Sequence, residues 1–238
     1  TDVVSPSASG FLPGLQGLHA AVVRKLDGDP LKEYRIQIEL PWMDGKNKLL
    51  WARLSTVYAT NASGNFFLPE PDDEVVGFMN EDPGHPIILG GVYGERHKPP
   101  YEYEAKNNTK AIVTREKMRI EFNEEKKMVK ISTPGKNTVE ISDDDKHIKL
   151  TDQNKNEIVM NSSGISFSSA KDITLKAKGA ITMDATSKFS ATAKQDVSLE
   201  GLNVNMQAKV SAAVKGNAKA ELSASGQTTV KGGMVMIN

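Results

Sequence analysis

Four histidines and one run of aspartates are the residues of this chain that could form a metal site. The histidines are His19, His85, His97 and His147. No two of them are spaced at i and i+2 or i+4, the spacings that metal sites favour. The run from Asp143 to Asp145 lacks the Asp-x-Asp-x-Asp-Gly pattern of a calcium loop, so a solvated turn is expected there. We therefore predict no metal site and assign the histidines to surface or packing roles.

Motifs for catalysis are equally sparse. Composition alone permits a Ser-His-Asp triad, but the sequence contains no Gly-x-Ser-x-Gly nucleophile elbow. The run from Gly90 to Gly94 lacks the lysine and the helix of a phosphate-binding loop. Four methionines fall at apolar positions of a repeat, where packing explains them better than metal ligation: Met183, Met206, Met234 and Met236. We expect neither catalysis nor a bound cofactor.

An eight-residue repeat runs from Ile165 to the C-terminus and determines where these side chains can lie. Large apolar residues occupy its first and third positions and a small residue occupies its fifth, which predicts a strand with one buried face. The broad i, i+3, i+4, i+7 stripe of a helix is absent. One residue is missing between Val197 and Val204, which predicts a local bulge or change of twist near Gly201 to Asn203. The expected core residues are Ile165, Phe167, Ile173, Leu175, Ile181, Met183, Phe189, Val197, Leu199, Val204, Met206, Val214, Leu222 and Val230.

A single chain of such octads has nothing against which to bury its apolar face, and its edges would stay open to pairing. A β-solenoid coil usually needs about 20 or more residues. Three octads, one from each of three chains, make a coil of about 24 residues, and the small fifth residue then fits the crowded axis. The octads therefore predict an all-β fold that ends in an intertwined homotrimeric triple-stranded β-helix, a β-prism.

The rest of the chain divides by composition and strand spacing. Residues 1–16 are expected to form a linker, and residues 17–97 carry about five strands between turn clusters, which fits an OB-fold barrel. Residues 98–163 repeat apolar pairs every nine to ten residues and are expected to form a neck, and residues 164–238 hold the octads and the tip. The expected strands of the first domain are 20–23, 34–40, 51–54 with 57–58, 66–68, 74–79 and 87–89.

The overall charge argues against two classes of partner. The 238 residues contain 30 basic and 30 acidic side chains, so a general binder of nucleic acid or anionic membrane is not expected. An OB barrel can bind oligonucleotides or sugars, but its basic residues stand among acidic ones. They are Arg24, Lys25, Lys32 and Arg35, interspersed with Asp27, Asp29, Glu33 and Glu39. Cysteine is absent, which fits folding in a reducing cytoplasm. No run of 18 apolar residues exists, so no membrane-spanning helix is expected.

Four motifs resemble those of the VgrG family, the spike proteins of type VI secretion systems, and their phage tail-spike relatives. They are Arg35–Leu40 followed by Pro41-Trp42, then Trp51-Ala52-Arg53, then Phe67-Leu68-Pro69-Glu70-Pro71-Asp72-Asp73-Glu74-Val75, and last His85-Pro86-Ile87-Ile88-Leu89-Gly90-Gly91-Val92-Tyr93. Asp72 stands where relatives usually have glycine, a small departure in a turn. The resemblance covers about residues 17 to 238.

The resemblance implies a trimeric needle that is assembled in the bacterial cytoplasm and driven through a target membrane. It implies an upstream hub, Hcp-like inner-tube and baseplate proteins at the N-terminal end, and effectors carried by the spike. It also implies a PAAR-like tip protein docked on the apolar end formed by Met234, Val235, Met236, Ile237 and Asn238. No inserted lysozyme or following toxin domain is expected. The alternatives are a spike of a phage tail or extracellular injection system, an enzyme or adhesin on a β-helical stalk, and an OB-type binder with an oligomerising tail.

Overall fold

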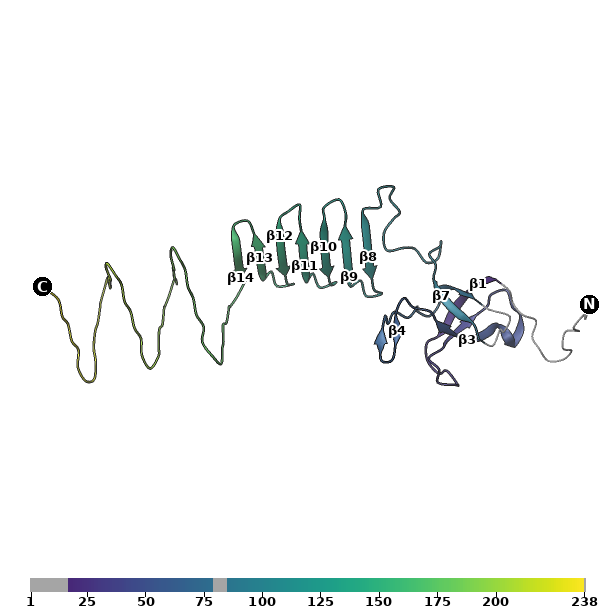
Figure 1. Cartoon of the computed structure of the whole chain (residues 1–238), viewed down its shortest axis with the longest axis horizontal. Coiled ribbons are helices and arrows are strands. Elements are labelled where there is room, and N and C mark those ends of the chain that lie inside the picture. Colours follow the sequence, from purple (N-terminus) through teal and green to yellow (C-terminus); the bar gives the residue numbers. More distant parts are fainter. Residues whose placement is uncertain (1–16, 79–84, 238) are drawn as a thin grey trace, which may run out of the picture. The chain divides into compact units, whose positions relative to one another are not determined.

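The computed structural model describes residues 17–78 and 85–237, and its regular elements are strands apart from one short 3₁₀ helix (Figure 1). The all-β class expected from the sequence is confirmed. The expected linker at residues 1–16 and the last residue, Asn238, lie outside the described residues. Nowhere in these two ranges does a helix reach the length and apolarity needed to cross a membrane.

Five strands close into a barrel in the order β1-β2-β3-β7-β6. Their bounds are β1 Leu18–Lys25, β2 Ile36–Glu39, β3 Leu49–Leu54, β6 Glu74–Phe78 and β7 Ile87–Gly91, and the 3₁₀ helix η1 spans Gly45–Lys48. All neighbours pair antiparallel except β3 and β7, which pair parallel. Alternate residues of the strands point inward and form a fully buried core of Ala21, Val23, Ile36, Ile38, Leu40, Ala52, Val75 and Ile88. This is the small closed barrel of the OB type.

A two-stranded hairpin replaces the strand expected at residues 66–68. It consists of β4 Ala59–Thr60 and β5 Ser63–Gly64, whereas residues 66–68 form no strand. Gly64 has a φ of 146°, and a Cβ there would lie 2.5 Å from the carbonyl oxygen of Tyr58. Only glycine permits this close approach of the two hairpin segments, so the turn signal at Gly64 outweighed the aromatic residues that follow it.

Seven antiparallel strands follow as an uninterrupted meander, here called the neck sheet. They are β8 Thr109–Val113, β9 Arg119–Asn123, β10 Met128–Ser132, β11 Thr138–Ser142, β12 His147–Thr151, β13 Glu157–Asn161 and β14 Gly164–Ser168. The first six start nine or ten residues apart, and the four from β10 to β13 contain apolar pairs noted in the sequence. The last strand, β14, pairs with β13 through Ile165 opposite Met160. The octad pattern therefore begins inside this sheet.

Five of the six turns between these strands use lysine in the left-handed backbone conformation, and the last has Gly164 at positive φ. Positive φ values occur at Lys117, Lys127, Lys136, Lys146 and Lys155. In four of these turns the lysine N–H donates to the carbonyl oxygen three residues earlier, for example Lys117 to Thr114 at 2.9 Å. Such a closed turn allows each strand to reverse tightly, and this keeps the meander regular.

Residues 174–237, here called the tail, form a separate compact unit. The tail contains no paired strand, and the chain bends at regular positions (Figure 1). The bends lie at Lys178–Gly179, Thr186–Ser187, Lys194–Gln195, Leu202, Lys209–Val210, Asn217–Ala218, Ser225–Gly226 and Gly233–Met234. They recur every eight residues except between Leu202 and Lys209, where the interval is seven. The missing residue of the sequence repeat therefore shortens one arm of the tail, next to the segment where a bulge was predicted.

Candidate functional site: an apolar wall and an unpaired tail

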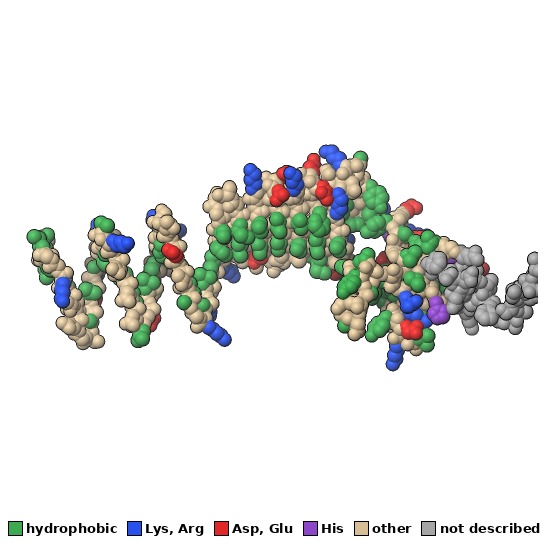
Figure 2. Space-filling model, viewed as in Figure 1, with side chains coloured by type: hydrophobic (Ala, Val, Ile, Leu, Met, Phe, Trp, Pro, Cys, Tyr) green, Lys and Arg blue, Asp and Glu red, His purple; other side chains and the backbone are tan. Residues whose placement is uncertain are grey.

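One face of the neck sheet is a continuous apolar surface, here called the apolar wall. Strand register aligns its side chains in two rows across the sheet. The first row is Phe122, Val129, Ile141, Ile148, Met160 and Ile165 and ends in β8 at the charged Lys110, and the second is Ile112, Ile120, Ile131, Val139, Leu150, Ile158 and Phe167. Figure 2 shows the wall as an unbroken band of hydrophobic side chains over the neck sheet. The wall follows from period-two alternation, because i and i+2 side chains lie on the same face of a strand.

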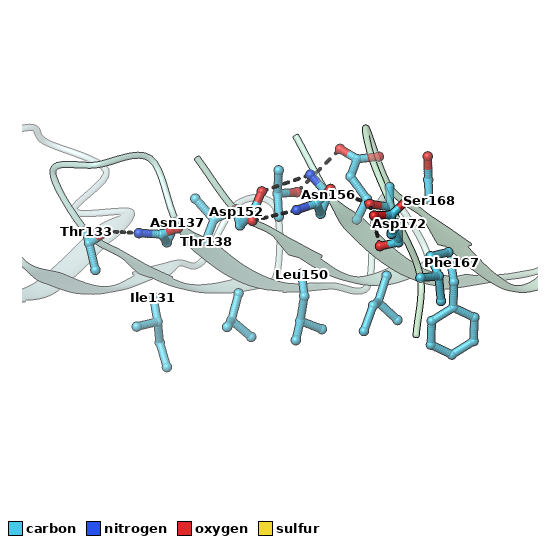
Figure 3. A pocket seen from close by; sticks show the side chains of 16 residues that line it. Ile131, Thr133, Asn137, Thr138, Leu150, Asp152, Asn156, Phe167, Ser168 and Asp172 are labelled. Atoms are coloured by element: carbon cyan, nitrogen blue, oxygen red, sulfur yellow. Dashed lines mark hydrogen bonds between the residues drawn. The ribbon is translucent and has the colours of Figure 1, made fainter. Parts of the chain in front are cut away.

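The wall is largely uncovered in the single chain. Most of its side chains keep between 37% and 66% of their surface exposed, with the highest values at Ile165 and Phe167. Along the second row lies an open hollow of about 540 Å³, lined by Ile131, Val139, Leu150, Ile158, Phe167 and Ile173 (Figure 3). Monomeric proteins rarely expose so large a contiguous apolar surface. The wall therefore has the size and apolar character of an interaction surface.

The opposite face of the same sheet is polar and carries charges of alternating sign. Register places Lys130 between Glu121 and Glu140 on the neighbouring strands. Lys130 Nζ lies 3.0 Å from Glu140 Oε2, and Lys149 Nζ lies 2.7 Å from Glu157 Oε1. The hydrogen bond from Lys130, together with that from His147, lowers the pKa of Glu140. A face with paired charges suits water, whereas the wall on the other side is apolar and uncovered.

Side-chain hydrogen bonds join successive turns along one border of the neck sheet. Asn137 Oδ1 accepts a hydrogen bond from the N–H of Gln153 at 3.1 Å. Asn156 Oδ1 accepts from Ser169 Oγ at 2.9 Å and from the N–H of Ala170 at 3.1 Å. Figure 3 shows Asn137 and Asn156 in line above the wall side chains. The border ties the segment that follows β14 to the turn between β12 and β13.

The tail leaves the predicted core residues exposed within one chain. Every one of them from Ile173 to Val230 keeps 52% to 84% of its surface exposed. Ile165 and Phe167 lie in the apolar wall and Ile173 lines the hollow along it, so the structure brings these three together with the neck. The predicted tip residues Met234, Val235, Met236 and Ile237 are 51% to 92% exposed, and Asn238 lies outside the described residues. The assignments of a buried core and a docking tip stay predictions.

One group of potential metal ligands was not predicted from the sequence. Ligand atoms of Glu140, Asp145 and His147 lie within 4.8 Å of one another. Strand pairing creates the group, because β11 and β12 bring Glu140 beside His147 with 3.0 Å between Oε1 and Nε2. Ser142 Oγ donates to Asp145 Oδ2 at 3.1 Å and holds the third member. The signal that could have found it is the Asp-x-His spacing, read together with strand register. Because Lys130 already pairs with Glu140, the group is an ion-pair network of the polar face.

The other histidines show no convergence on a site among the described residues. The His19 ring packs 5.1 Å from the Trp42 ring, centroid to centroid. His97 contributes to a separate hollow beside the barrel that is also lined by Leu68 and Tyr93.

The two arginines among the basic residues named above, Arg24 and Arg35, are used in ion pairs of the barrel itself. Arg35 Nη2 lies 2.6 Å from Asp29 Oδ1, and both side chains are nearly buried. Hydrogen bonds from Arg35 hold the pKa of Asp29 well below its usual range, and backbone N–H groups of Leu31 and Glu33 add to this effect. Arg24 bridges Glu39 and Asp72. Phosphate groups would have to compete with these carboxylates, which weighs against a nucleic-acid surface here.

Family comparisons agree with the two parts of this architecture. Residues 19–93 match the type VI secretion system/phage-baseplate injector OB domain. Residues 128–238 match the phage baseplate V C-terminal trimerisation domain. The first match confirms the OB-type barrel. The second covers most of the apolar wall and the whole tail and supports a homotrimer.

Individual relatives are type VI secretion proteins. The spike protein VgrG1c of Pseudomonas aeruginosa is 32% identical over 108 residues, which is 42% of this chain and 15% of the relative. The spike protein VgrG1a of the same organism is 30% identical over 112 residues, 44% of this chain and 17% of the relative. A Vibrio cholerae protein named actin cross-linking toxin VgrG1 is 30% identical over 112 residues, 44% of this chain and 10% of the relative. The matched region is thus less than a fifth of each relative. The barrel, the trimerisation domain and these relatives together show that the chain belongs to the VgrG and phage-baseplate family of spike proteins.

Proposed function

We propose that three copies of this chain form the central spike of a contractile injection machine of the type VI kind. The observation that carries the proposal is the tail, where residues 174–237 form no strand within the chain although apolar side chains recur every eight residues. Buried backbone groups need hydrogen-bond partners, and other copies of the chain can supply them. The match of residues 128–238 to a trimerisation domain supports three as their number.

The spike acts mechanically and has no catalytic role in this proposal. Three interwound chains pair their backbone groups with one another and leave no long free edge, so the rod is stiff. Contraction of the machine drives the rod through a target membrane, with the barrels on the side of the Hcp-like inner tube and the baseplate. A PAAR-like tip protein and effectors travel with it. The chain is assembled in the bacterial cytoplasm and then secreted or injected.

Light scattering of the purified chain tests the trimer. We expect a mass three times that of the 25.9 kDa chain, and a band of the same size on an SDS gel of an unboiled sample. The interwound tails must separate before the detergent can disperse the copies. A monomer or dimer in both measurements would refute the proposal.

The apolar segment from Met234 to Asn238 is the proposed dock for the tip protein. Its described side chains Met234, Val235, Met236 and Ile237 are more than half exposed in the single chain. We expect that deleting residues 234–238 abolishes binding of a PAAR-like protein in a pull-down and leaves the trimer intact. Lys231→Ala, just before this segment, serves as the matched control and retains binding. Retained binding by the deletion variant would contradict the assignment of this segment as the dock.

A spike of a phage tail or of an extracellular injection system is the second candidate. It is favoured because the descriptions of both matched families name the phage baseplate. Sedimentation of the producing culture distinguishes the two. A type VI spike appears free in the culture medium only when the contractile sheath is intact, whereas a phage-type spike sediments with tail particles.

A further inference from the structure

The repeat of the tail does not by itself determine the register in which its octads align with those of other copies. Its octads repeat the same pattern, so Ile173 and Ile181 occupy equivalent positions, as do Leu175 and Met183. When one copy slips by eight residues, apolar side chains again meet apolar side chains, and register is weakly specified in such a case. The seven-residue interval after Leu202 opposes a slip, but only over the length of one octad.

The neck sheet, unlike the tail, has a structure that can fix the register between copies. Each of its strands is fixed within one chain by pairing with its neighbours, and its turns alternate between the two borders of the sheet. Strands lie about 4.8 Å apart, so seven strands give a wall roughly 30 Å long. In a three-chain β-helix each octad advances a chain by about one strand spacing. A slip of one octad therefore moves one wall by one strand relative to the others and uncovers about a seventh of its contact.

The neck also transmits its position to the tail through a short covalent and hydrogen-bonded path. Asn156 Oδ1 accepts hydrogen bonds from Ser169 Oγ and from the N–H of Ala170, and Ser169 Oγ lies 3.3 Å from the carbonyl oxygen of Asp172. These bonds fix the chain directly after β14, one residue before Ile173. With the three walls aligned, a tail can slip only if a whole octad loops out.

We infer that the apolar wall, including β8 and β9, is the surface on which three copies of this chain pack and that it sets the register of the three tails. The inference rests on the proposed trimer and adds to it the element that aligns the copies. Its partner is two further copies of the same wall, because the wall is continuous by strand register from β14, inside the matched trimerisation domain, to Ile112 in β8, outside it. The charged reverse face of the sheet leaves the wall as the packing side.

Disulfide trapping in a cysteine-free chain measures the register directly. Ala224 and Gly232 are small fifth-position residues of adjacent octads. One chain carries Ala224→Cys and a second, distinguishable by mass, carries Gly232→Cys, and the two are co-expressed. In-register trimers give only links between like positions. A slip of one octad gives unlike links between positions 224 and 232.

The decisive variants lie on β8 and β9, outside residues 128–238. With the native wall we expect unlike links to be at least tenfold rarer than like links. Ile112→Asp or Ile120→Asp is expected either to raise unlike links to a level similar to that of like links or to prevent assembly altogether. Glu121→Gln, on the polar face of β9, keeps an acceptor for the Tyr101 hydroxyl, which lies 2.6 Å from Glu121, and is expected to match the native wall.

Each outcome decides between the alternatives. Trimers of Ile112→Asp and Ile120→Asp that still give only like links would overturn the inference, as would mixed links with the native wall. Monomeric variants with intact barrels, judged by the fluorescence of Trp42 and Trp51, support it, because the tails then fail to assemble without the walls. A native chain that is not trimeric contradicts the proposed function instead, and light scattering before trapping separates this case.

Discussion

Replacing Ile131 with aspartate is expected to dissociate the trimer. Ile131 lies in the middle of the second row of the apolar wall, between Ile120 and Val139, and 46% of its surface is exposed in the single chain. That uncovered part is available for burial against other copies. Across the wall, the exposed fractions amount to about four to five whole side chains. At about 1.5–3 kcal/mol for each whole apolar side chain, the wall contributes roughly 7–14 kcal/mol per copy.

The cost of the substitution follows from the same numbers. Losing burial of nearly half a side chain removes about 1 kcal/mol, and placing a carboxylate in the apolar contact costs several kcal/mol more. The loss of association free energy is then about 4 kcal/mol per copy. It is about 12 kcal/mol per trimer, because symmetry changes all three walls together. Each 1.4 kcal/mol is a factor of ten, so the dissociation constant rises by roughly eight orders of magnitude.

Sedimentation velocity at micromolar concentration measures this effect. Ile131→Asp is expected to sediment as a monomer with an intact barrel. Lys130→Gln, the neighbour on the polar face, loses only the partly exposed contact with Glu140, which is worth about 1 kcal/mol or less, and stays trimeric. A trimeric Ile131→Asp chain at the same concentration would show that the wall is not an interface between copies.

Three further predictions concern turns and ion pairs. Lys127→Gly is expected to stabilise the chain by about 0.5–1 kcal/mol, because glycine removes the strain of a left-handed residue, while Lys126→Gly, where φ is not positive, destabilises it by a similar amount; thermal unfolding compares the two. Gly64→Ala is expected to open the β4–β5 hairpin, since its Cβ would lie 2.5 Å from a carbonyl oxygen, and faster amide exchange at Asn65 reports this; unchanged exchange contradicts it. Because the pKa of Asp29 is lowered by folding, its contribution to stability is present above its unfolded pKa and is lost as the pH falls below about 4. Asp29→Asn is therefore expected to lose less stability than the native chain between pH 7 and pH 3, and an equal loss would refute the role of Asp29.

Local patterns in the sequence were sufficient to predict most of the fold. Alternation at Val129 and Ile131, repeated every nine to ten residues, predicted the neck strands, because a strand needs only a period of two and a turn at each end. The missing residue before Val204 coincides with the seven-residue interval between the bends at Leu202 and Lys209, and the bulge or change of twist expected there stays a prediction. The expected strand at residues 66–68 was wrong, because its aromatic residues favour a strand while the chain at that point has already turned at Gly64.

Contacts that depend on strand register were not predictable from one sequence. The group of Glu140, Asp145 and His147 forms only when β11 and β12 pair, and the sequence alone did not specify which of their residues face each other. The two rows of the apolar wall arise in the same way, from seven strands in one register. The capture of Ser169 by Asn156 joins residues 13 apart through a turn, and no repeat pattern marks it.

The difference in pairing between neck sheet and tail determines how each region resists force. In the neck sheet every strand is joined to its neighbours by hydrogen bonds and by tight turns of the same chain, so compression across the strands is carried within one polypeptide. The tail has no such internal pairing. In the proposed three-chain rod, each octad of the tail would therefore transmit force to a different chain. In the proposed trimer, a force along the rod would be shared among three backbones at every octad of the tail and carried by three separate sheets in the neck.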